Sequence, residues 1–276
     1  MRNLNQDNIT QAVIASFANT SDPRLKEIMT SLVQHLHAFA REVKLTEAEW
    51  FRGIEFLTRC GHITDDKRQE FILLSDVLGL SMLTVTMNND KPAGCTEATV
   101  FGPFHVEGAP HYKLGDDVAN GAKGTPCVVY GTVKGIDGEP IPGAHLDVWQ
   151  SDDDGLYDVQ HEGLGHAQAR GILNADPQGH YHFRSIVAVP YAIPHDGPVG
   201  AMLEATGRHP WRPAHLHFLV KAPGYETLIT HVFRDKSDYL DSDAVFGVRQ
   251  SLVCDWVQQA DGTYVMEYDF VLNPQK

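Results

Sequence analysis

The stretch WRPAHLHFLV, residues 211–220, places two histidines one residue apart inside an apolar run. Side chains alternate between the two faces of a β-strand, and the rise is about 3.3 Å per residue. His215 and His217 would therefore share one face, with Cα atoms about 6.6 Å apart, and their imidazoles could bind one metal ion. Leu216 and Phe218 would point to the other face, into a core. The alternative, with one histidine in the core and the other in solvent, stays open at this point.

Arg212 lies three residues before His215 and adds a fixed positive charge, because a guanidinium group does not deprotonate in proteins. The stretch as a whole predicts a metal site that receives an anionic substrate.

Composition excludes several classes of partner. The 276 residues include 22 basic and 36 acidic ones, and the net charge of −14 argues against nucleic acid or an anionic membrane as partner. The four cysteines are widely spaced and form no Cys-x-x-Cys motif, which is typical of reduced thiols in a cytosol. The sequence shows no signal peptide and no apolar run of about 20 residues. We therefore expect a cytoplasmic protein without membrane insertion.

The first 99 residues show helical periodicity. Asp22 followed by Pro23 predicts a helix start. Apolar residues then recur with i, i+3, i+4, i+7 spacing, which predicts one buried stripe. This stripe consists of Leu25, Ile28, Met29, Leu32, Leu36, Phe39 and Val43.

Two further helices are expected in this region. Thr46 and Glu49 have the spacing of a capping box and predict a helix that Gly61 ends. The residues Thr64-Asp65-Asp66 predict the start of a third, long and apolar helix that continues through Leu83. Such a helix is typical of a core or a subunit interface.

From residue 100 onward, short β-rich runs alternate with glycine, proline and aspartate turns. We expect strands near residues 127–133, 145–149, 181–187, 215–220, 228–233, 252–257 and 264–272. This pattern predicts an all-β sandwich domain over residues 100–276, preceded by a helical domain over residues 1–99.

The residue types leave the remaining ligands undecided. His180 and His182 have the same spacing as the first pair, but a solvated strand face with Tyr181 turned inward explains them better. A solvated loop likewise explains His161 and His166. The third ligand could be a carboxylate from residues 152–154, another histidine or a phenolate. These options favour ferrous iron, zinc and Fe(III), respectively.

Two tyrosines are candidate phenolate ligands. Tyr157 follows the turn at residues 152–156, and Tyr191 lies between Pro190 and Pro194, which stiffen the chain. An ordinary tyrosine at a sandwich edge is the alternative for each.

Three sequence blocks together resemble the intradiol ring-cleaving dioxygenases. They are residues 147–157 (DVWQ and GLY), residues 190–200 (PYAIP and DGPVG) and residues 212–217 (RPAHLH). Residues 73–81 (LLSD and LGLS) are similar to the catechol and hydroxyquinol 1,2-dioxygenase branch.

The resemblance implies an Fe(III) ion held by Tyr157, Tyr191, His215 and His217. It also implies that an ortho-diol binds the ion as a dianion and that Tyr191 leaves the iron and helps to take up a proton. Arg212 would stabilise charge that builds on the ring. O2 would cleave the ring between the two hydroxylated carbons and give a muconate-type product.

The substrate implied by the resemblance is hydroxyquinol, with catechol or a chlorocatechol as the alternative. The residues similar to the pocket of hydroxyquinol-cleaving relatives are Leu73, Asp76, Val100, Phe101, Gly102, Pro103, Ile193, Pro194 and Arg212. Asp76 could accept a hydrogen bond from a third ring hydroxyl, or it could face solvent or pair with a base. His231 stands where catechol-cleaving relatives tend to carry glutamine, which mildly favours the triol.

The resemblance further implies a homodimer formed through the helical part, with a phospholipid held between the two helical domains. Two other classes stay open. Residues 130–149 also resemble transthyretin-like and carboxypeptidase-regulatory sandwiches that bind partners. A zinc hydrolase could use the same two histidines.

Overall fold

The structure is a computed structural model that describes residues 2–65 and 68–275. The chain forms two compact units, Met1–Arg59 and Cys60–Lys276. The first unit contains α1 (Ile9–Ser16), α2 (Pro23–Glu42) and most of α3 (Glu47–Ile63). The predicted caps are confirmed: the Asp22 carboxylate accepts hydrogen bonds from two N–H groups of the first turn of α2, and Thr46 and Glu49 form reciprocal bonds before α3.

The apolar stripe of α2 is not buried within this chain, so that prediction was wrong. Leu25, Ile28 and Leu32 are 46–48% exposed, and Leu36 and Phe39 are each 55% exposed. The periodicity identified an apolar face correctly, but the described residues of this chain leave about half of the surface of these side chains exposed.

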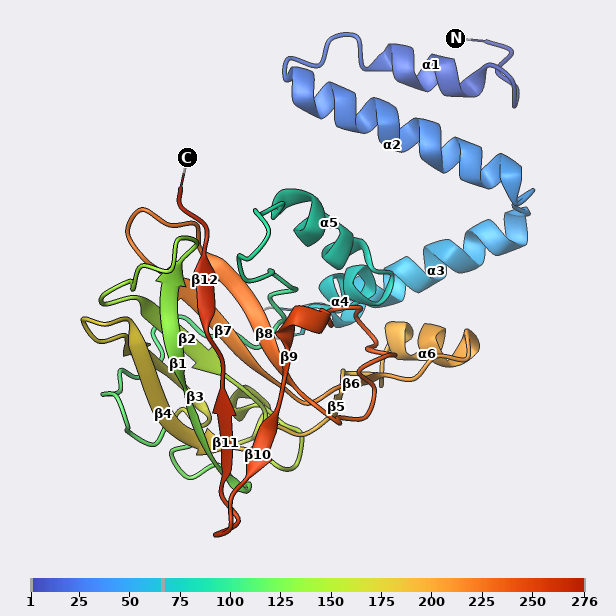
Figure 1. Cartoon of the computed structure of the whole chain (residues 1–276). Helices are drawn as coiled ribbons and strands as arrows, with labels where there is room; N and C mark the ends of the chain where they lie inside the picture. The colour runs from blue at the N-terminus through green and yellow to red at the C-terminus, as the bar shows by residue number, and fades with distance from the viewer. Residues whose placement is uncertain (1, 66–67, 276) are drawn as a thin grey trace. The chain divides into compact units, whose positions relative to one another are not determined.

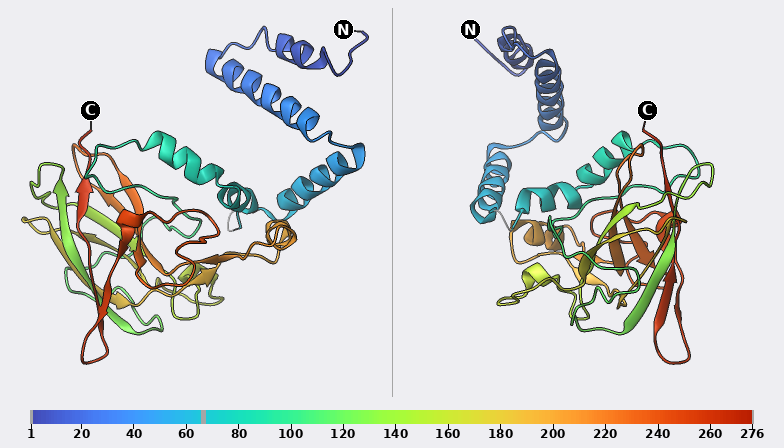
Figure 2. Two further views of the ribbon diagram at one scale, coloured as in Figure 1. Left: turned by 45° about the vertical axis from the view of Figure 1, so that its right-hand side comes forward. Right: turned by 90° about the vertical axis from the view of Figure 1, so that its left-hand side faces the viewer.

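The predicted third helix is in fact two helices. α4 (Glu70–Val77) and α5 (Leu80–Asn88) are bent by 76° relative to each other. The bend can be followed in Figure 2. Gly79 separates them with φ of 75°, a left-handed conformation that favours glycine. The helix also starts later than expected, at Glu70, and Asp66 lies outside the described residues. No single helix in the described ranges is long and apolar enough to cross a membrane, although this bent pair passes on length and composition.

The second unit is dominated by two five-stranded sheets and one short ribbon (Figure 1). One sheet has the order β10-β11-β1-β12, with β4 paired to β1, and the other has the order β3-β2-β7-β8-β9. The first contains β1 (Pro126–Gly135), β4 (His180–Ile186), β10 (Trp256–Gln258), β11 (Tyr264–Glu267) and β12 (Phe270–Leu272). The second contains β2 (His145–Trp149), β3 (Arg170–Asn174), β7 (His215–Lys221), β8 (Leu228–Arg234) and β9 (Val253–Cys254).

Both sheets contribute to one hydrophobic core. Phe218 of β7 lies with its ring centroid 4.7 Å from that of Phe270 in β12 and 6.2 Å from that of Tyr181 in β4. Leu216 is in the same core, so the inward orientation predicted for Leu216 and Phe218 is confirmed. The opposite face of β7 lies outside this core, so its side chains can form a functional site.

Most predicted strands are present, but the sequence did not indicate every element. Residues 252–257 form β9 and β10 with a break between them, and residues 264–272 form β11 and β12. The elements not predicted include β3, the short β5 (Tyr191–Ala192) and β6 (Trp211–Arg212), and α6 (Pro198–Ala205). β5 and β6 pair with each other and place Tyr191 directly opposite Arg212.

Candidate active site

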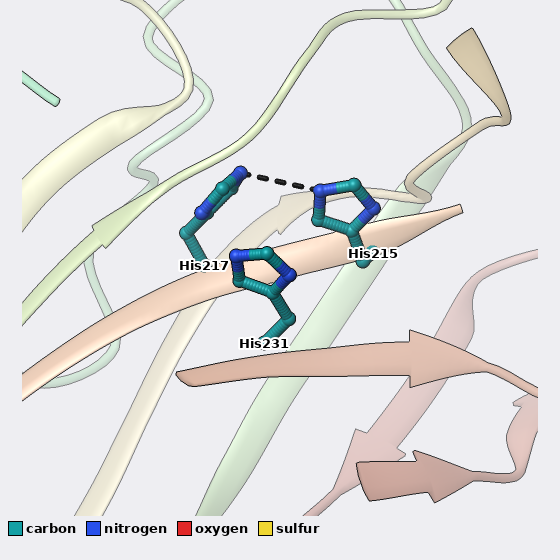
Figure 3. A group of neighbouring side chains, drawn as sticks. All are labelled: His215, His217 and His231. Carbon is teal, nitrogen blue, oxygen red and sulfur yellow. Dashed lines mark hydrogen bonds between the residues drawn. The ribbon is translucent and has the colours of Figure 1, made fainter. Parts of the chain in front are cut away.

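Three histidines meet on the face of β7 and β8 that is turned away from the core. His215 and His217 come from β7, and backbone pairing sets His217 opposite His231 of β8. Figure 3 shows the three imidazoles side by side, with the Nε2 atoms of His215 and His217 3.2 Å apart. All three rings are at most 2% exposed. One ring nitrogen from each of these three histidines lies within 4.8 Å of the other two, so the cluster could bind a metal ion.

Both predicted tyrosines reach this cluster. The hydroxyl oxygen of Tyr157 lies 2.8 Å from Nε2 of His217, and the Tyr157 ring is fully buried. Tyr191, which is 5% exposed, packs its ring 5.5 Å from those of both Tyr157 and His215. Two phenols and two imidazoles from three separate segments therefore converge on one buried region.

The loop that carries Tyr157 is held by its own side chains. The backbone N–H of Tyr157 donates to the side chain of Gln160 over 2.9 Å. The neighbouring Asp158 forms a buried ion pair with Arg170 of β3, with Nε of Arg170 2.7 Å from the carboxylate. These contacts fix the phenol without using its oxygen.

Arg212 links the cluster to a carboxylate that the sequence analysis missed. Its Nε and Nη2 donate to Asp243 over 3.0 and 3.2 Å. Its Nη1 lies 3.4 Å from the Tyr191 hydroxyl and 3.2 Å from Nε2 of His215, and its Nη2 lies 3.3 Å from Nδ1 of His231. The guanidinium group thus has partners on every side, and it faces both a phenol and an imidazole.

Electrostatics keeps the imidazoles neutral and the guanidinium charged. Burial and the charge of Arg212 lower the pKa of His215 to about 3. Nδ1 of His215 donates to the Pro213 carbonyl over 2.7 Å, so its Nε2 presents a lone pair to the cluster. Burial alone would lower the pKa of Arg212, but the Asp243 carboxylate, Tyr191 and Tyr157 together raise it.

The alternative ligands have other structural roles. The Asp152 carboxylate accepts hydrogen bonds from Asp154 N–H and Leu156 N–H and pairs with His161 over 2.7 Å, so it closes the turn before Tyr157. His180 and His182 lie on the exposed face of β4 while Tyr181 is buried, as expected.

A cavity of about 540 Å³ lies next to the cluster. Its lining includes Leu73 and Asp76 of α4 together with Pro103 and Pro194. Phe104, also in the lining, stacks on Tyr157 with ring centroids 4.4 Å apart, so the cavity adjoins the phenol.

The other predicted pocket residues do not line this cavity. Val100 and Ile193 are buried at 3% and 5% exposure, Phe101 is 39% exposed, and Arg212 is buried in the cluster. Gly102, with φ of 77°, lies against His217, and a Cβ there would be 3.1 Å from the imidazole.

Asp76 is buried at 6% exposure, so it does not face solvent. Burial raises the pKa of its carboxyl group, and a hydrogen bond from Ser81 and the charge of Arg212 oppose this only in part. A buried carboxyl group in a wall of mixed polar and apolar residues can recognise a polar substituent on a ring.

Asp243 and Phe104 show what sequence reasoning missed. Asp243 lies in a loop 31 residues from Arg212, and no periodicity or motif indicates the pairing. Phe104 was next to the predicted residues 100–103, and that adjacency is the signal that could have identified it.

Comparison with known proteins agrees with this geometry. Residues 100–274 match the dioxygenase family, and residues 22–96 match the family described as the catechol dioxygenase N terminus. A 6-chlorohydroxyquinol 1,2-dioxygenase from Cupriavidus pinatubonensis is 69% identical over 274 residues, which are 99% of each chain. A hydroxyquinol 1,2-dioxygenase from Nocardioides simplex is 55% identical and is matched over 93% of this chain and 87% of its own length.

A solved structure has the same fold. The crystal structure of hydroxyquinol 1,2-dioxygenase from Pseudomonas putida DLL-E4 superposes with a TM-score of 0.92 and 46% sequence identity, over 98% of this chain and 99% of that one. Together with the histidine cluster, these matches confirm the resemblance carried by the three sequence blocks. The chain therefore belongs to the intradiol ring-cleavage dioxygenases, a family of non-haem iron enzymes, and lies in its hydroxyquinol 1,2-dioxygenase branch.

Proposed function

We propose that this chain uses O2 to cleave hydroxyquinol (1,2,4-benzenetriol) between its two adjacent hydroxylated carbons. The product is 3-hydroxy-cis,cis-muconate or its tautomer maleylacetate. The observation that carries the proposal is the buried cluster of phenols and imidazoles beside a cavity that Asp76 lines. The relatives named for hydroxyquinol and 6-chlorohydroxyquinol support this substrate, and catechol or chlorocatechol is the alternative.

The proposed metal ligands are Tyr157, Tyr191, His215 and His217. Their fit to iron rests on the close approach of the Tyr157 oxygen and the two Nε2 atoms. Burial raises the pKa of Tyr157 well above its usual range, so this phenol needs a nearby cation to lose its proton. A bound Fe(III) ion would stabilise the diol in its doubly deprotonated form, and the ring of this dianion would be electron-rich enough to react with O2.

Three of the protein's own groups have proposed roles in the reaction. The Arg212 guanidinium stabilises negative charge that builds on the ring, because it is held in a buried site where such charge is poorly solvated. Tyr191 takes up a substrate proton at its hydroxyl oxygen, which lies 3.4 Å from Arg212. Phe104 stacks over Tyr157 and keeps water away from it.

The proposed substrate contacts use the residues of the cavity wall and the segments beside it. Asp76 forms a hydrogen bond with the third hydroxyl group. The apolar contacts to the ring come from Leu73, Pro103 and Pro194 of the cavity wall. Val100, Phe101, Gly102 and Ile193 would contribute from the neighbouring segments.

The proposal includes a sandwich arrangement of the two sheets and a domain division at residue 99. The separate family matches to residues 22–96 and 100–274 support this division, although the compact units meet at residues 59 and 60. The shared core of the second unit supports the sandwich. A homodimer formed through the helical region is supported by the exposed apolar residues of α2 and α3. The same faces would accommodate a phospholipid between two helical regions. The wide spacing of the four cysteines, without a Cys-x-x-Cys motif, supports a cytoplasmic location.

Oxygen uptake on protein of known iron content tests the function. Hydroxyquinol, 6-chlorohydroxyquinol, catechol and chlorocatechols would be compared as substrates. We expect the triols to give the highest kcat/KM and the iron-loaded protein to absorb in the visible through tyrosinate-to-iron charge transfer. A strong preference for catechol would overturn the substrate, and an iron-replete but colourless protein would overturn the ligand set.

A further inference from the structure

A part-buried Asp–His pair contributes its histidine to the wall of the cavity, and none of the roles above uses it. His105 lines the cavity that Asp76 also lines, and its Nε2 lies 2.7 Å from Oδ2 of Asp147. Asp147 is 6% exposed and belongs to β2. A carboxylate in such a place needs a hydrogen-bond donor, and His105 provides it.

The pairing decides which nitrogen of His105 carries the proton. Asp147 lies within β2, whose backbone pairs it with Ile172 of β3 on one side and Leu219 of β7 on the other, so its position is fixed. Because the carboxylate accepts from Nε2–H, Nδ1 is the ring nitrogen that can carry a lone pair. Among the described residues, the His105 side chain forms a hydrogen bond only through Nε2, and it is 12% exposed.

Aromatic contacts orient the His105 ring and tie it to the metal cluster. Its centroid lies 4.8 Å from that of Trp149, edge to face, and 4.9 Å from that of Phe101. Trp149 in turn stacks on His217 at 4.7 Å. Asp147 and Trp149 are two residues apart on β2 and share the sheet face of the histidine cluster. The Trp149 ring therefore contacts both His105 and His217, which is a proposed iron ligand.

We propose that His105 determines substrate specificity by accepting, at Nδ1, a hydrogen bond from the third hydroxyl of a trihydroxylated ring. Asp147 is a positioning residue that holds the imidazole in the accepting tautomer. The inference rests on the proposed function and adds to it the group that distinguishes a triol from a diol. A wall that contains an unpaired acceptor favours a ligand with a hydroxyl and disfavours one without it.

The contact is compatible with Asp76 because a hydroxyl group both donates and accepts. When its proton goes to His105, the hydroxyl oxygen remains available to Asp76. Burial raises the pKa of Asp76, which is the direction that makes a protonated carboxyl group easier to reach. The two side chains would then serve opposite sides of one substituent.

Two amide substitutions separate the specificity role from a structural one. The side-chain amide of asparagine places a polar atom near the position of histidine Nδ1, whereas that of glutamine places one near Nε2. His105→Asn thus keeps an acceptor toward the cavity and loses the Asp147 contact, and His105→Gln does the reverse. His105→Phe retains the ring but neither contact.

The measurements are kcat/KM for hydroxyquinol and catechol, and anaerobic calorimetric binding of the same two compounds. We expect His105→Gln and His105→Phe to lose about tenfold in preference for hydroxyquinol, with catechol little changed, and His105→Asn to keep most of the preference. His180→Phe is the matched control, because His180 pairs with Asp176 on an exposed strand face.

Several outcomes would overturn the inference. They are equal losses on both compounds, no loss in any variant, or a wild-type-like His105→Gln beside an impaired His105→Asn. Thermal unfolding of each variant identifies a folding defect, and the two amide variants decide the question even if His105→Phe does not fold. If the wild-type enzyme does not turn over hydroxyquinol, the proposed function itself has failed.

Discussion

The β-rich unit and the N-terminal helices use their apolar residues differently. In β7, Leu216 and Phe218 are 1% and 0% exposed, because both lie in the core of their own chain. In α2, Leu36 and Phe39 follow an equally regular pattern but are each 55% exposed. Periodicity thus identifies which face of an element is apolar, but it does not say whether the same chain or another molecule covers that face.

If the β-rich unit contains the complete reaction chemistry, Tyr157→Phe should have the largest effect of any change considered. The substitution removes one phenol oxygen and keeps the ring that stacks on Phe104. We expect kcat to fall by at least about 10⁴-fold, the scale on which loss of one member of a catalytic unit acts. Oxygen uptake, iron content and visible absorption would be measured together.

Tyr130→Phe is the matched control, since Tyr130 is 37% exposed and its hydroxyl donates to Glu267. It should retain both activity and iron. Normal iron content and colour in Tyr157→Phe would contradict the proposed ligand.

The second prediction concerns the buried ion pair between Arg212 and Asp243. Asp243→Asn leaves Arg212 buried without its counter-charge, and breaking such a pair costs about 3–5 kcal/mol of unfolding free energy. Burial alone would raise the pKa of Asp243, but Arg212 outweighs this and lowers it. A carboxylate whose pKa is lowered on folding stabilises the protein above its usual value of 3.8 and loses that contribution as the pH falls through the lowered value.

The difference in free energy of unfolding between wild type and Asp243→Asn should therefore be largest at neutral pH and decrease in acid. Urea unfolding between pH 7 and pH 3 measures it, with the exposed Asp153→Asn as control. A difference that grows toward low pH would contradict the assignment.

The third prediction addresses the uncovered helical face. Leu36→Ser combined with Phe39→Ser should weaken dimer formation at least about 100-fold, because each large apolar side chain buried on association contributes about 1.5–3 kcal/mol. Light scattering over a concentration series reports the mass. Val257→Ser, which alters a 54% exposed residue of β10, should leave the mass unchanged. A wild-type protein that is monomeric at micromolar concentration would show that no second copy covers this face.

The smallest expected effect concerns selectivity within the cavity. Asp76→Ala should reduce kcat/KM for hydroxyquinol about tenfold more than for catechol, because one hydrogen bond to the third hydroxyl is lost. Steady-state kinetics on both compounds measures this, with the exposed Asp137→Ala as control. Equal losses on both substrates would assign Asp76 to the structure of α4 instead.

Local signals in the sequence predicted local structure well. The Asp22 cap and the Thr46–Glu49 capping box depend on residues three or fewer positions apart, and both form as expected. The single long third helix was wrong because the run of apolar residues concealed the break at Gly79.

Long-range pairing was the harder part of the site. His215 and His217 could be placed together because one strand fixes their relation. The partnership of Arg212 with Asp243 depends on how a loop folds back over the sheet, and no short-range pattern contains that information. The ligand set came from a family resemblance and not from the physical chemistry of the residues.

The alternation of side chains between the two faces of β7 has a consequence for misfolded molecules. Leu216 and Phe218 enter the core while His215 and His217 enter the reactive site, so a slip of one residue in pairing would exchange the two sets. A misregistered molecule would place imidazoles among hydrocarbon side chains and would lose its iron site in the same event. The interactions that favour the native strand pairing therefore also assemble the iron site. Molecules that are stable but inactive because of a shifted register should not accumulate.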